Sequence, residues 1–362
     1  MRSDAMARVL VAMSGGVDSS VAAALLAREG HEVVGVTFNQ WPASQTLRNA
    51  RSGCCTPRTI DDARHVCQIL GAPHYVLNFR AEFEAAVIGP WSRGYLRGET
   101  PNPCVTCNDR VRFPELIRKA DELGAEFVAT GHYARVANGA SWRLLRARDS
   151  GKDQSYVLHM LQQDQLRRVR LPLGDLRKPD VRRMAGEFDL PVADKPDSQE
   201  ICFVPDGDYA AVVRRQGTSG QGPIVESDGR VVGRHDGIES ATIGQRRGLG
   251  LGGGGGRRYV TAIDADLNTL VVGPRDAAMV SSISVRDVRW IDGPAASPPA
   301  HAEVQTRSHA RAARARLEPQ SGSTLSVVFD EPAWAPAPGQ AAVFYRGDEV
   351  LGGGVIDRPE VS

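Results

Sequence analysis

The 362-residue sequence has no run of about 18 consecutive apolar residues and no signal-peptide pattern. We therefore expect neither a helical membrane protein nor a secreted one, and the prediction is a cytoplasmic location. An excess of one charge is also missing, because 44 basic residues stand against 43 acidic ones and leave a formal net charge of +1. A uniformly basic, nucleic-acid-coating protein is excluded, so any contact with RNA must come from local patches.

Lysine is scarce, since only Lys119, Lys152, Lys178 and Lys195 interrupt an otherwise all-arginine set of 44 basic residues. The base composition of a genome produces the same bias, so the number of arginines is not evidence for an RNA interface. Cysteine occurs six times. In a cytosolic chain, reactive thiols or metal ligands are expected before structural disulfides.

The chain is too long for a single hydrophobic core, and its pattern changes after about residue 212. Up to that point, short apolar segments alternate with helical patterns, which predicts a parallel sheet with crossover helices. We expect strands at residues 31–38, 74–79 and 125–130. We expect helices at residues 57–70 and 113–123.

From about residue 213 onward, short strands separated by Gly, Asp and Asn replace the alternating pattern. We expect them at residues 222–232, 240–250 and 258–273. Several more evenly spaced strands follow residue 281 and predict a small β-barrel. The sequence therefore predicts an α/β protein with a doubly wound parallel sheet at 1–212, a mostly-β domain at 213–280 and a C-terminal β-barrel at 281–362.

Residues 9–20, VLVAMSGGVDSS, read as a buried strand, a glycine turn and the start of a helix. Such a turn aims free backbone N–H groups and a helix N-terminus at one point, which favours an anion, most plausibly phosphate. The segment lacks the lysine of a Walker A loop and does not read GxGxxG. The alternative is an ordinary tight turn between a strand and a helix.

Ligands of such sheets lie beyond the carboxyl ends of the strands, where Phe38 and Gly131 are also expected. Phe38 either stacks on an adenine or belongs to the core. Gly131 either permits close approach of a nucleotide or only makes a turn. Asp18 is either a partner of magnesium or a carboxylate that caps the helix or lies in its first turn.

Cys104 and Cys107 form a CVTC motif after the segment TPNP, whose prolines argue for a loop rather than a helix. Structural zinc needs four ligands, and there is no second CxxC to supply them. A thioredoxin-like motif normally opens a helix directly after a strand. Cys202 follows the polar segment DSQE. Taken alone, each of these cysteines fits a small buried residue better than a nucleophile.

The segment SGGVDSS resembles the loop of the ATP pyrophosphatases, which split ATP between its α- and β-phosphates and adenylate a substrate. Together with the cysteines, eight ordered motifs make nearly the whole chain resemble the tRNA-specific 2-thiouridylases. These motifs are SGGVDSS, TPNPCVTCN, ATGHYAR, KDQSYVL, DSQEICFV, TIGQRRGLG, PGQAAVFY and LGGGVI.

The resemblance implies an N-terminal ATP-pyrophosphatase domain that uses ATP and Mg²⁺ to adenylate the carbon-2 oxygen of the wobble uridine in tRNA. It implies that Cys202 carries a persulfide, delivered by a donor protein such as a cysteine desulfurase or relay carrier, and that Cys107 is the nucleophile. The ATP-contacting positions it implies are Ala12, Met13, Ser14, Gly15, Gly16, Val17, Asp18, Ser19, Phe38 and Gly131. The tRNA-contacting positions it implies are Asn102, Pro103, Cys104, His132, Lys152, Asp153, Gln154, Arg307, Ser308 and Gln340.

Three features depart from the family pattern, one of which is the glycine loop at 252–256, for which no role is predicted. Cys104 stands where some members carry an acidic residue, and Ser308-His309 replaces a bulkier pair. No role is predicted for Cys54 and Cys55. Three other functions remain open: a small-molecule AMP-forming synthetase, a redox or iron–sulfur protein with Cys104, Cys107 and Cys202 as ligands, and a non-catalytic RNA-binding module.

Overall fold

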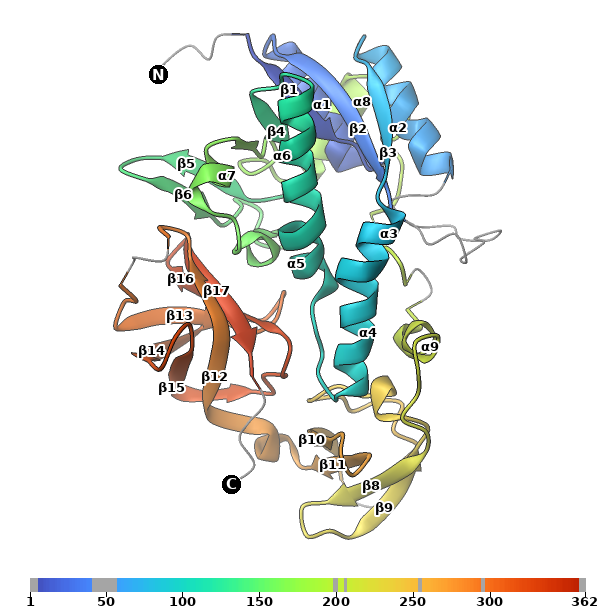
Figure 1. The fold of residues 1–362 in the computed structure, drawn as a ribbon, viewed down its shortest axis with the longest axis vertical. Coiled ribbons are helices and arrows are strands. Elements are labelled where there is room, and N and C mark those ends of the chain that lie inside the picture. The colour runs from blue at the N-terminus through green and yellow to red at the C-terminus, as the bar shows by residue number, and fades with distance from the viewer. Residues whose placement is uncertain are drawn as a thin grey trace.

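The computed structural model describes residues 6–40, 57–197, 201–204, 207–252, 256–293 and 297–357. An N-terminal α/β region lies at one end of the molecule, a small β-region lies at the other, and a C-terminal barrel lies beside the helices that run between them (Figure 1). The predicted succession of a parallel sheet, a β-rich region and a barrel is confirmed.

The N-terminal region is built on a five-stranded parallel sheet of order β3-β2-β1-β4-β7. Each predicted strand is present within a few residues of its expected bounds. The strands are β1 (Arg8–Ala12), β2 (Glu32–Asn39), β3 (His74–Asn78), β4 (Phe127–Ala129) and β7 (Val169–Arg170).

Helices cover both faces of this sheet, as the doubly wound prediction requires. Val9 and Val11 of β1 face helices α1, α2 and α8, whereas Leu10 faces the opposite core with α6. The helices are α1 (Val17–Arg28), α2 (Pro57–Ile69), α3 (Arg80–Phe83), α4 (Gly89–Leu96), α5 (Pro103–Cys107), α6 (Phe113–Glu122), α7 (Gln163–Leu166), α8 (Lys178–Glu187) and α9 (Tyr209–Arg214). Two π-helical segments, η1 (Glu84–Ile88) and η2 (Asn108–Arg112), join α3 to α4 and α5 to α6, and η3 (Ser155–Leu158) is a 3₁₀ turn.

The central region is a four-stranded sheet of order β10-β11-β8-β9. Two segments predicted as single strands are hairpins, because a turn interrupts each of them. The predicted strand at 240–250 is wrong: this segment follows the 3₁₀ turn η4 (Ile238–Ser240) as turns and bends. The strands are β8 (Gly222–Glu226), β9 (Val231–His235), β10 (Tyr259–Asp264) and β11 (Thr269–Gly273), followed by the 3₁₀ turn η5 (Arg275–Ala278).

The C-terminal sheet closes on itself through pairing of β12 with β17, which makes it a barrel. A hairpin of the N-terminal region, β5 (Arg135–Asn138) and β6 (Trp142–Leu145), extends this sheet along β17. The barrel strands are β12 (Met279–Trp290), β13 (His301–Gln305), β14 (Ala313–Pro319), β15 (Leu325–Trp334), β16 (Ala341–Arg346) and β17 (Glu349–Ile356). In the part of the chain that is described, no helix has the length and apolar character needed to cross a membrane.

Candidate nucleotide and sulfur-transfer site

The turn between β1 and α1 is held tightly against α2. Gly15 has a φ of +70°, and a Cβ built on it would lie 2.0 Å from the carbonyl oxygen of Thr59. Gly16 is the N-cap of α1, and no side chain accepts a hydrogen bond as a cap there. The first turn of α1 therefore keeps backbone N–H groups for an anion, as the sequence predicts.

Serine hydroxyls fix the shape of this turn from inside. Ser14 Oγ and Ser19 Oγ lie 3.1 Å apart, and Ser14 N donates to Ser19 Oγ at 3.1 Å. Ser20 Oγ donates to the carbonyl of Gly16 at 2.8 Å. These bonds make the loop rigid before any ligand binds, which is the property an electrostatic site needs.

Asp18 is a first-turn carboxylate and not the helix cap. Its Oδ1 accepts hydrogen bonds from Tyr133 Oη at 2.8 Å and from Lys178 Nζ at 2.6 Å. Burial and the Asp18 charge raise the pKa of Tyr133, so its hydroxyl stays protonated and donates. The carboxylate therefore joins α1 to α8 and to the segment after β4.

Asp197 gathers three cationic side chains next to Asp18. It accepts from Lys152 Nζ at 2.7 Å and from Lys178 Nζ at 3.0 Å, and Arg182 completes the group. Burial alone would raise the pKa of Asp197, but the two ammonium groups outweigh it and hold the pKa to about 2. Lys178 thus bridges two carboxylates, one of them on the glycine loop.

Lys195 approaches the loop from its other side. Its Nζ donates to the carbonyl of Gly15 at 2.7 Å and also contacts Asp62 of α2. Three of the four lysines, Lys152, Lys178 and Lys195, therefore gather around the loop. The sequence motifs do not predict Lys178 and Lys195. The scarcity of lysine in an arginine-rich chain is the signal that could have identified them.

Several predicted nucleotide contacts can offer only their backbone. Met13 and Val17 are 2% and 4% exposed, so their side chains belong to the core. Phe38 is also buried and packs edge to face on Phe79, with ring centroids 5.0 Å apart. A Cβ on Gly131 would lie 2.7 Å from the backbone nitrogen of Ser19, so this glycine lets the end of β4 approach the loop.

The prediction that Cys104 and Cys107 lie in a loop is wrong, because both belong to α5. Pro103 occupies the first turn, where a missing N–H costs nothing, and Asn102 Oδ1 caps the helix by accepting from Cys104 N at 3.0 Å and Val105 N at 3.3 Å. Prolines that exclude a helix interior therefore start a helix here. Cys104 is exposed and Cys107 is buried.

A polar path connects Cys107 to the end of β4. The next residue, Asn108, is fully buried, and its Oδ1 accepts from Arg112 Nη1 at 2.7 Å. The same Nη1 lies 3.5 Å from His132 Nε2, while His132 Nδ1 lies 2.8 Å from Thr130 Oγ1. Burial, aided by Arg112, lowers the pKa of His132 to about 3, so the ring is neutral and Nε2 accepts.

Cys107 consequently lies at the rim of the sheet that carries the glycine loop. His132 follows Gly131, which touches the backbone of Ser19. Beyond the end of β2, Gln40 Nε2 donates to Cys107 Sγ at 3.8 Å. The nucleophile candidate and the anion site are therefore joined through the ends of β2 and β4, the two strands that flank β1 in the sheet.

Cys202 is anchored on both sides of its segment. Asp197, five residues earlier, is bonded to Lys178. The backbone from Asp197 to Cys202 can span at most about 18 Å. Phe203, the next residue, packs on Phe83 and Trp91 at centroid distances of 5.7 and 5.2 Å. Cys202 packs against the hydrophobic core that includes Cys107. Residues 198–200, and Cys54 and Cys55, lie outside the described part of the chain.

Two residues predicted to contact tRNA make internal bonds beside the loop. Asp153 accepts four hydrogen bonds, from Arg146 Nη1, Ala147 N, Ser155 N and Ser155 Oγ. Gln154 Oε1 accepts from Tyr133 N at 2.9 Å. These bonds fix the segment that presents Lys152.

Arg307 and Gln340 lie where the three regions meet. Arg307 Nη2 donates to the carbonyls of Ile243 and Ala335 at 2.6 and 2.8 Å. Gln340 Nε2 donates to the carbonyl of Thr100 at 2.6 Å. Ser308 contributes its carbonyl to Gln305 Nε2 at 2.8 Å. Gln340 therefore holds the barrel to the segment before α5, and Arg307 holds it to the central region.

The parallel sheet, its glycine loop and the cations at its rim define a nucleotide-binding α/β domain joined to two β-domains. A family profile described as a tRNA methyl transferase HUP domain matches residues 7–206. Profiles described as a tRNA methyl transferase PRC-barrel domain and an aminomethyltransferase beta-barrel domain match residues 210–274 and 280–356.

Relatives that cover the whole chain identify the family. Proteins named tRNA-specific 2-thiouridylase MnmA are 50% identical in Chloroflexus aurantiacus, over 99% of this chain and 100% of the relative, and 46% identical in Geobacter metallireducens, over 99% and 98%. A third, from Heliobacterium modesticaldum, is 46% identical over 97% of this chain and 92% of the relative. The chain belongs to the tRNA-specific 2-thiouridylase family.

Proposed function

We propose that this protein is a tRNA-uridine sulfurtransferase that uses ATP to replace the carbon-2 oxygen of the wobble uridine with sulfur. Full-length similarity to the 2-thiouridylases supports the activity and the tRNA substrate. The observation that carries the proposal is the contact path from the glycine loop through Gly131, His132 and Arg112 to the helix of Cys107. An adenylating site and a thiol therefore share one rim.

The first step prepares the base for substitution. An amide-like oxygen is a poor leaving group, so it is converted to an adenylate, and pyrophosphate departs. The open N–H groups of α1, together with Lys178 and Lys195, are proposed to stabilise charge on the phosphates during this transfer. Because Asp18, Asp197 and Asp62 hold the two ammonium groups in place, the site needs little reorganisation during the transfer.

Magnesium is part of the same proposal. Mg²⁺ at an ATP site takes most of its ligands from phosphates and water and needs only one or two carboxylates. Asp18 offers such a carboxylate in the first turn of α1, and the described residues contain no group of three or more potential ligands that would form a separate all-protein site. When bound, the ion would offset the charge of the phosphates.

The second step delivers sulfur. A donor protein, a cysteine desulfurase or relay carrier, loads Cys202 as a persulfide. The terminal sulfur of this persulfide bonds to carbon 2 of the uridine as AMP leaves. The thiolate of Cys107 attacks the inner sulfur, on Cys202, and the persulfide S–S bond breaks. A Cys107–Cys202 disulfide remains, and a thiol reductant restores both residues. The shared core of the two cysteines supports this exchange.

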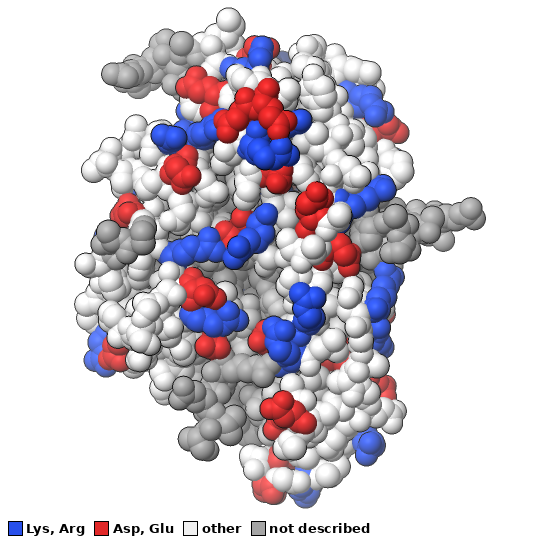
Figure 2. Space-filling model, in the orientation of Figure 1, with Lys and Arg blue, Asp and Glu red and all other residues white. Residues whose placement is uncertain are grey.

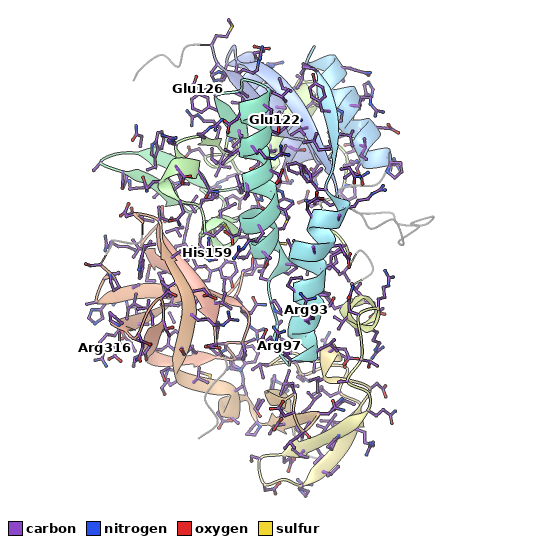
Figure 3. All side chains as sticks on the ribbon, in the orientation of Figure 1. Arg93, Arg97, Glu122, Glu126, His159 and Arg316 are labelled. Carbon is purple, nitrogen blue, oxygen red and sulfur yellow. The ribbon has the colours of Figure 1, made fainter. Side chains whose placement is uncertain are left out.

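Surface arginines on one side of the molecule supply charge for the tRNA backbone. Basic side chains gather over the middle of the face shown in Figure 2, where Arg93 and Arg97 project from α4 (Figure 3). Arg110, in η2, is 67% exposed. The target base is proposed to reach Asn102, Pro103 and Cys104, since chemistry on a base requires it to leave the stack.

The remaining predicted tRNA contacts stay part of the proposal, as does a cytoplasmic location, where tRNA is found. They are His132, Lys152, Asp153, Gln154, Ser308 and Gln340, whereas Arg307 is proposed to act by holding the regions together.

The test is thiolation by the purified full-length protein with ATP, Mg²⁺, a persulfide source and unmodified tRNA, measured as 2-thiouridine by nucleoside mass spectrometry. Cys107→Ser and Cys202→Ser are each expected to abolish the product. Cys67→Ala, which removes a buried thiol of helix α2, is expected to keep it. Pyrophosphate released without tRNA but with a small-molecule acceptor would instead identify an AMP-forming synthetase.

A further inference from the structure

Gln40 is a buried polar side chain that contacts the candidate nucleophile. It directly follows the last residue of β2 and is 2% exposed. Its Nε2 donates to Sγ of Cys107, which is 5% exposed, at 3.8 Å. None of the eight sequence motifs includes Gln40, and the reaction steps above give its amide no role.

Bonds of the neighbouring residues hold Gln40 in this place. The carbonyl of Asn39 accepts from Phe79 N at 3.0 Å, and Asn39 Oδ1 accepts from Arg80 Nε at 3.4 Å. Phe38, on the same strand, packs on the ring of Phe79. The end of β2 is thereby tied to the start of α3, and the amide of Gln40 is positioned at the rim of the sheet.

We infer that Gln40 is a catalytic residue of sulfur transfer, because its amide N–H stabilises the thiolate of Cys107. The inference rests on the proposed function, in which this thiolate attacks the inner sulfur of the Cys202 persulfide. Before the attack, the thiol of Cys107 loses its proton to water. The sulfur keeps the electron pair that then forms its bond to Cys202 Sγ.

The burial of Cys107 gives the hydrogen bond its importance. A thiolate is the reactive form of cysteine, and apolar surroundings disfavour it relative to the thiol. A hydrogen bond to an ionised acceptor is about twice as strong as one between neutral groups, so a donor at this sulfur favours ionisation. An amide is also neutral, and it leaves more nucleophilicity on the sulfur than a strong shift of ionisation by a cation would.

Other groups around α5 keep their own partners when residue 40 is changed. The elements η1, η2 and η3 pack against α5, and the charged and titratable side chains on them are bonded to neighbours. These pairs are Glu84 with Gln216, Asp109 with Arg289 and Arg110, Arg112 with Asn108 and His132, and Tyr156 with the carbonyl of Ala341. The other thiols of the region are Cys104 and Cys202. A change in the ionisation of Cys107 on substitution of Gln40 therefore reports on the amide.

The test is the pH dependence of Cys107 alkylation in the full-length protein, followed by iodoacetamide labelling and peptide mass spectrometry. Gln40→Met keeps the length of the side chain and removes the donor, so we expect the midpoint of labelling to rise by about one pH unit. Gln40→Glu keeps the shape, but its carboxylate repels a thiolate, so we expect a larger rise. Gln68→Met, at an exposed glutamine of α2, is expected to keep the midpoint.

Two results of this titration would overturn the inference. One is an unchanged midpoint in Gln40→Met. The other is a midpoint in Gln40→Glu at or below that of the unaltered protein.

A single turnover of the persulfide-loaded protein with ATP, Mg²⁺ and tRNA supplies the second readout. At pH 7, Gln40→Met is expected to form 2-thiouridine about tenfold more slowly, and its rate is expected to recover as the pH approaches the raised midpoint. A deficit of the same size at every pH would make Gln40 a packing residue and would contradict the inference. Absence of 2-thiouridine from the unaltered protein would instead count against the proposed function, and the titration of Cys107 is independent of that result.

Discussion

At the scale of single residues, the ammonium of Lys178 connects the first turn of α1 to Asp197. It lies between Asp18 and Asp197, and its side chain is only 10% exposed. Lys178→Ala would leave both carboxylates without this partner, and we expect a loss of about 2 kcal/mol in the free energy of unfolding. We also expect ATP to bind at least about tenfold more weakly, because a phosphate-facing cation is lost. Denaturant unfolding and calorimetric titration with ATP measure the two effects.

Lys119 provides the matched lysine control. It pairs with Glu122 three residues along α6, where Glu122 is 44% exposed. Lys119→Ala is expected to change unfolding by less than about 0.5 kcal/mol and to leave ATP binding unchanged. If both alanine variants bound ATP equally well, Lys178 would be a structural residue only.

Asp197 makes a second residue-scale prediction, in its dependence on pH. Its pKa is about 2 in the folded protein, below the ordinary 3.8, so its ionised form stabilises the fold. This contribution is present above about pH 4 and is lost as pH falls through 2. Relative to Asp197→Asn, the native protein is expected to be more stable by about 2 kcal/mol at pH 7, with the difference shrinking between pH 4 and pH 2. Unfolding curves over this range measure it; a difference independent of pH would refute the cause.

At the scale of elements, the junction of β1 and α1 requires glycine for two separate reasons. Gly15 has a left-handed backbone, and its missing side chain leaves room for the carbonyl of Thr59 on α2. Gly15→Ala is expected to destabilise the protein by about 3 kcal/mol, because strain and collision add, and to abolish ATP binding. Gly30 has a φ of +89° with no atom within 4 Å of an added Cβ, so Gly30→Ala isolates the strain and is expected to cost about 1 kcal/mol.

The elements that could be predicted from the sequence are those whose signals are local. The strand, glycine turn and helix of residues 9–28 follow one another in sequence, so periodicity and turn residues sufficed. The sequence does not predict the helix of Cys107, because proline breaks a helix interior, although at the first helical position it is favourable. The hairpin β5–β6 joins a strand of the distant barrel, and no local pattern encodes that partner.

The same distinction separates the parts of the candidate site. The loop residues could be named from a contiguous motif, whereas Lys178 and Lys195 reach them from 160 and 180 positions away in sequence. Conversely, the motif assigned Phe38 and Asp153 to ligands, but tertiary packing engages the ring of Phe38 and all the oxygens of Asp153 within the protein. The sequence therefore shows which residues are important more readily than it shows which atoms they contact.

At the scale of the whole molecule, the segment between α4 and α5 ties the catalytic region to both β-regions. Thr100 is 8% exposed; its N donates to the carbonyl of Pro338 at 2.7 Å and its Oγ1 to Thr242 Oγ1 at 3.3 Å. Gln340 returns a bond to the carbonyl of Thr100. Because this segment leads directly into the capped helix of Cys104 and Cys107, the position of the cysteines depends on how the three regions are docked.

Arg307 tests that dependence, because it bonds carbonyls of the central region and of the end of β15. Burial lowers the pKa of Arg307, yet two carbonyl acceptors hold its guanidinium in place. Arg307→Ala is expected to cost about 2 kcal/mol of unfolding free energy and to slow thiolation, while ATP binding by the distant glycine loop is unchanged. Arg316→Ala, on the barrel strand β14 (Figure 3), removes a 57% exposed arginine and is expected to change neither.

The salt dependence of tRNA binding separates docking from direct contact. If Arg307 neutralises a phosphate, its removal lowers the slope of log affinity against log salt by about one. If it acts by holding the regions together, the slope stays the same while the affinity falls at every salt concentration. We expect the second result, because the two hydrogen bonds of Arg307 Nη2 are internal and tRNA phosphates have exposed alternatives in Arg93, Arg97 and Arg110. A slope reduced by one, with an unchanged free energy of unfolding, would place Arg307 in contact with the RNA instead.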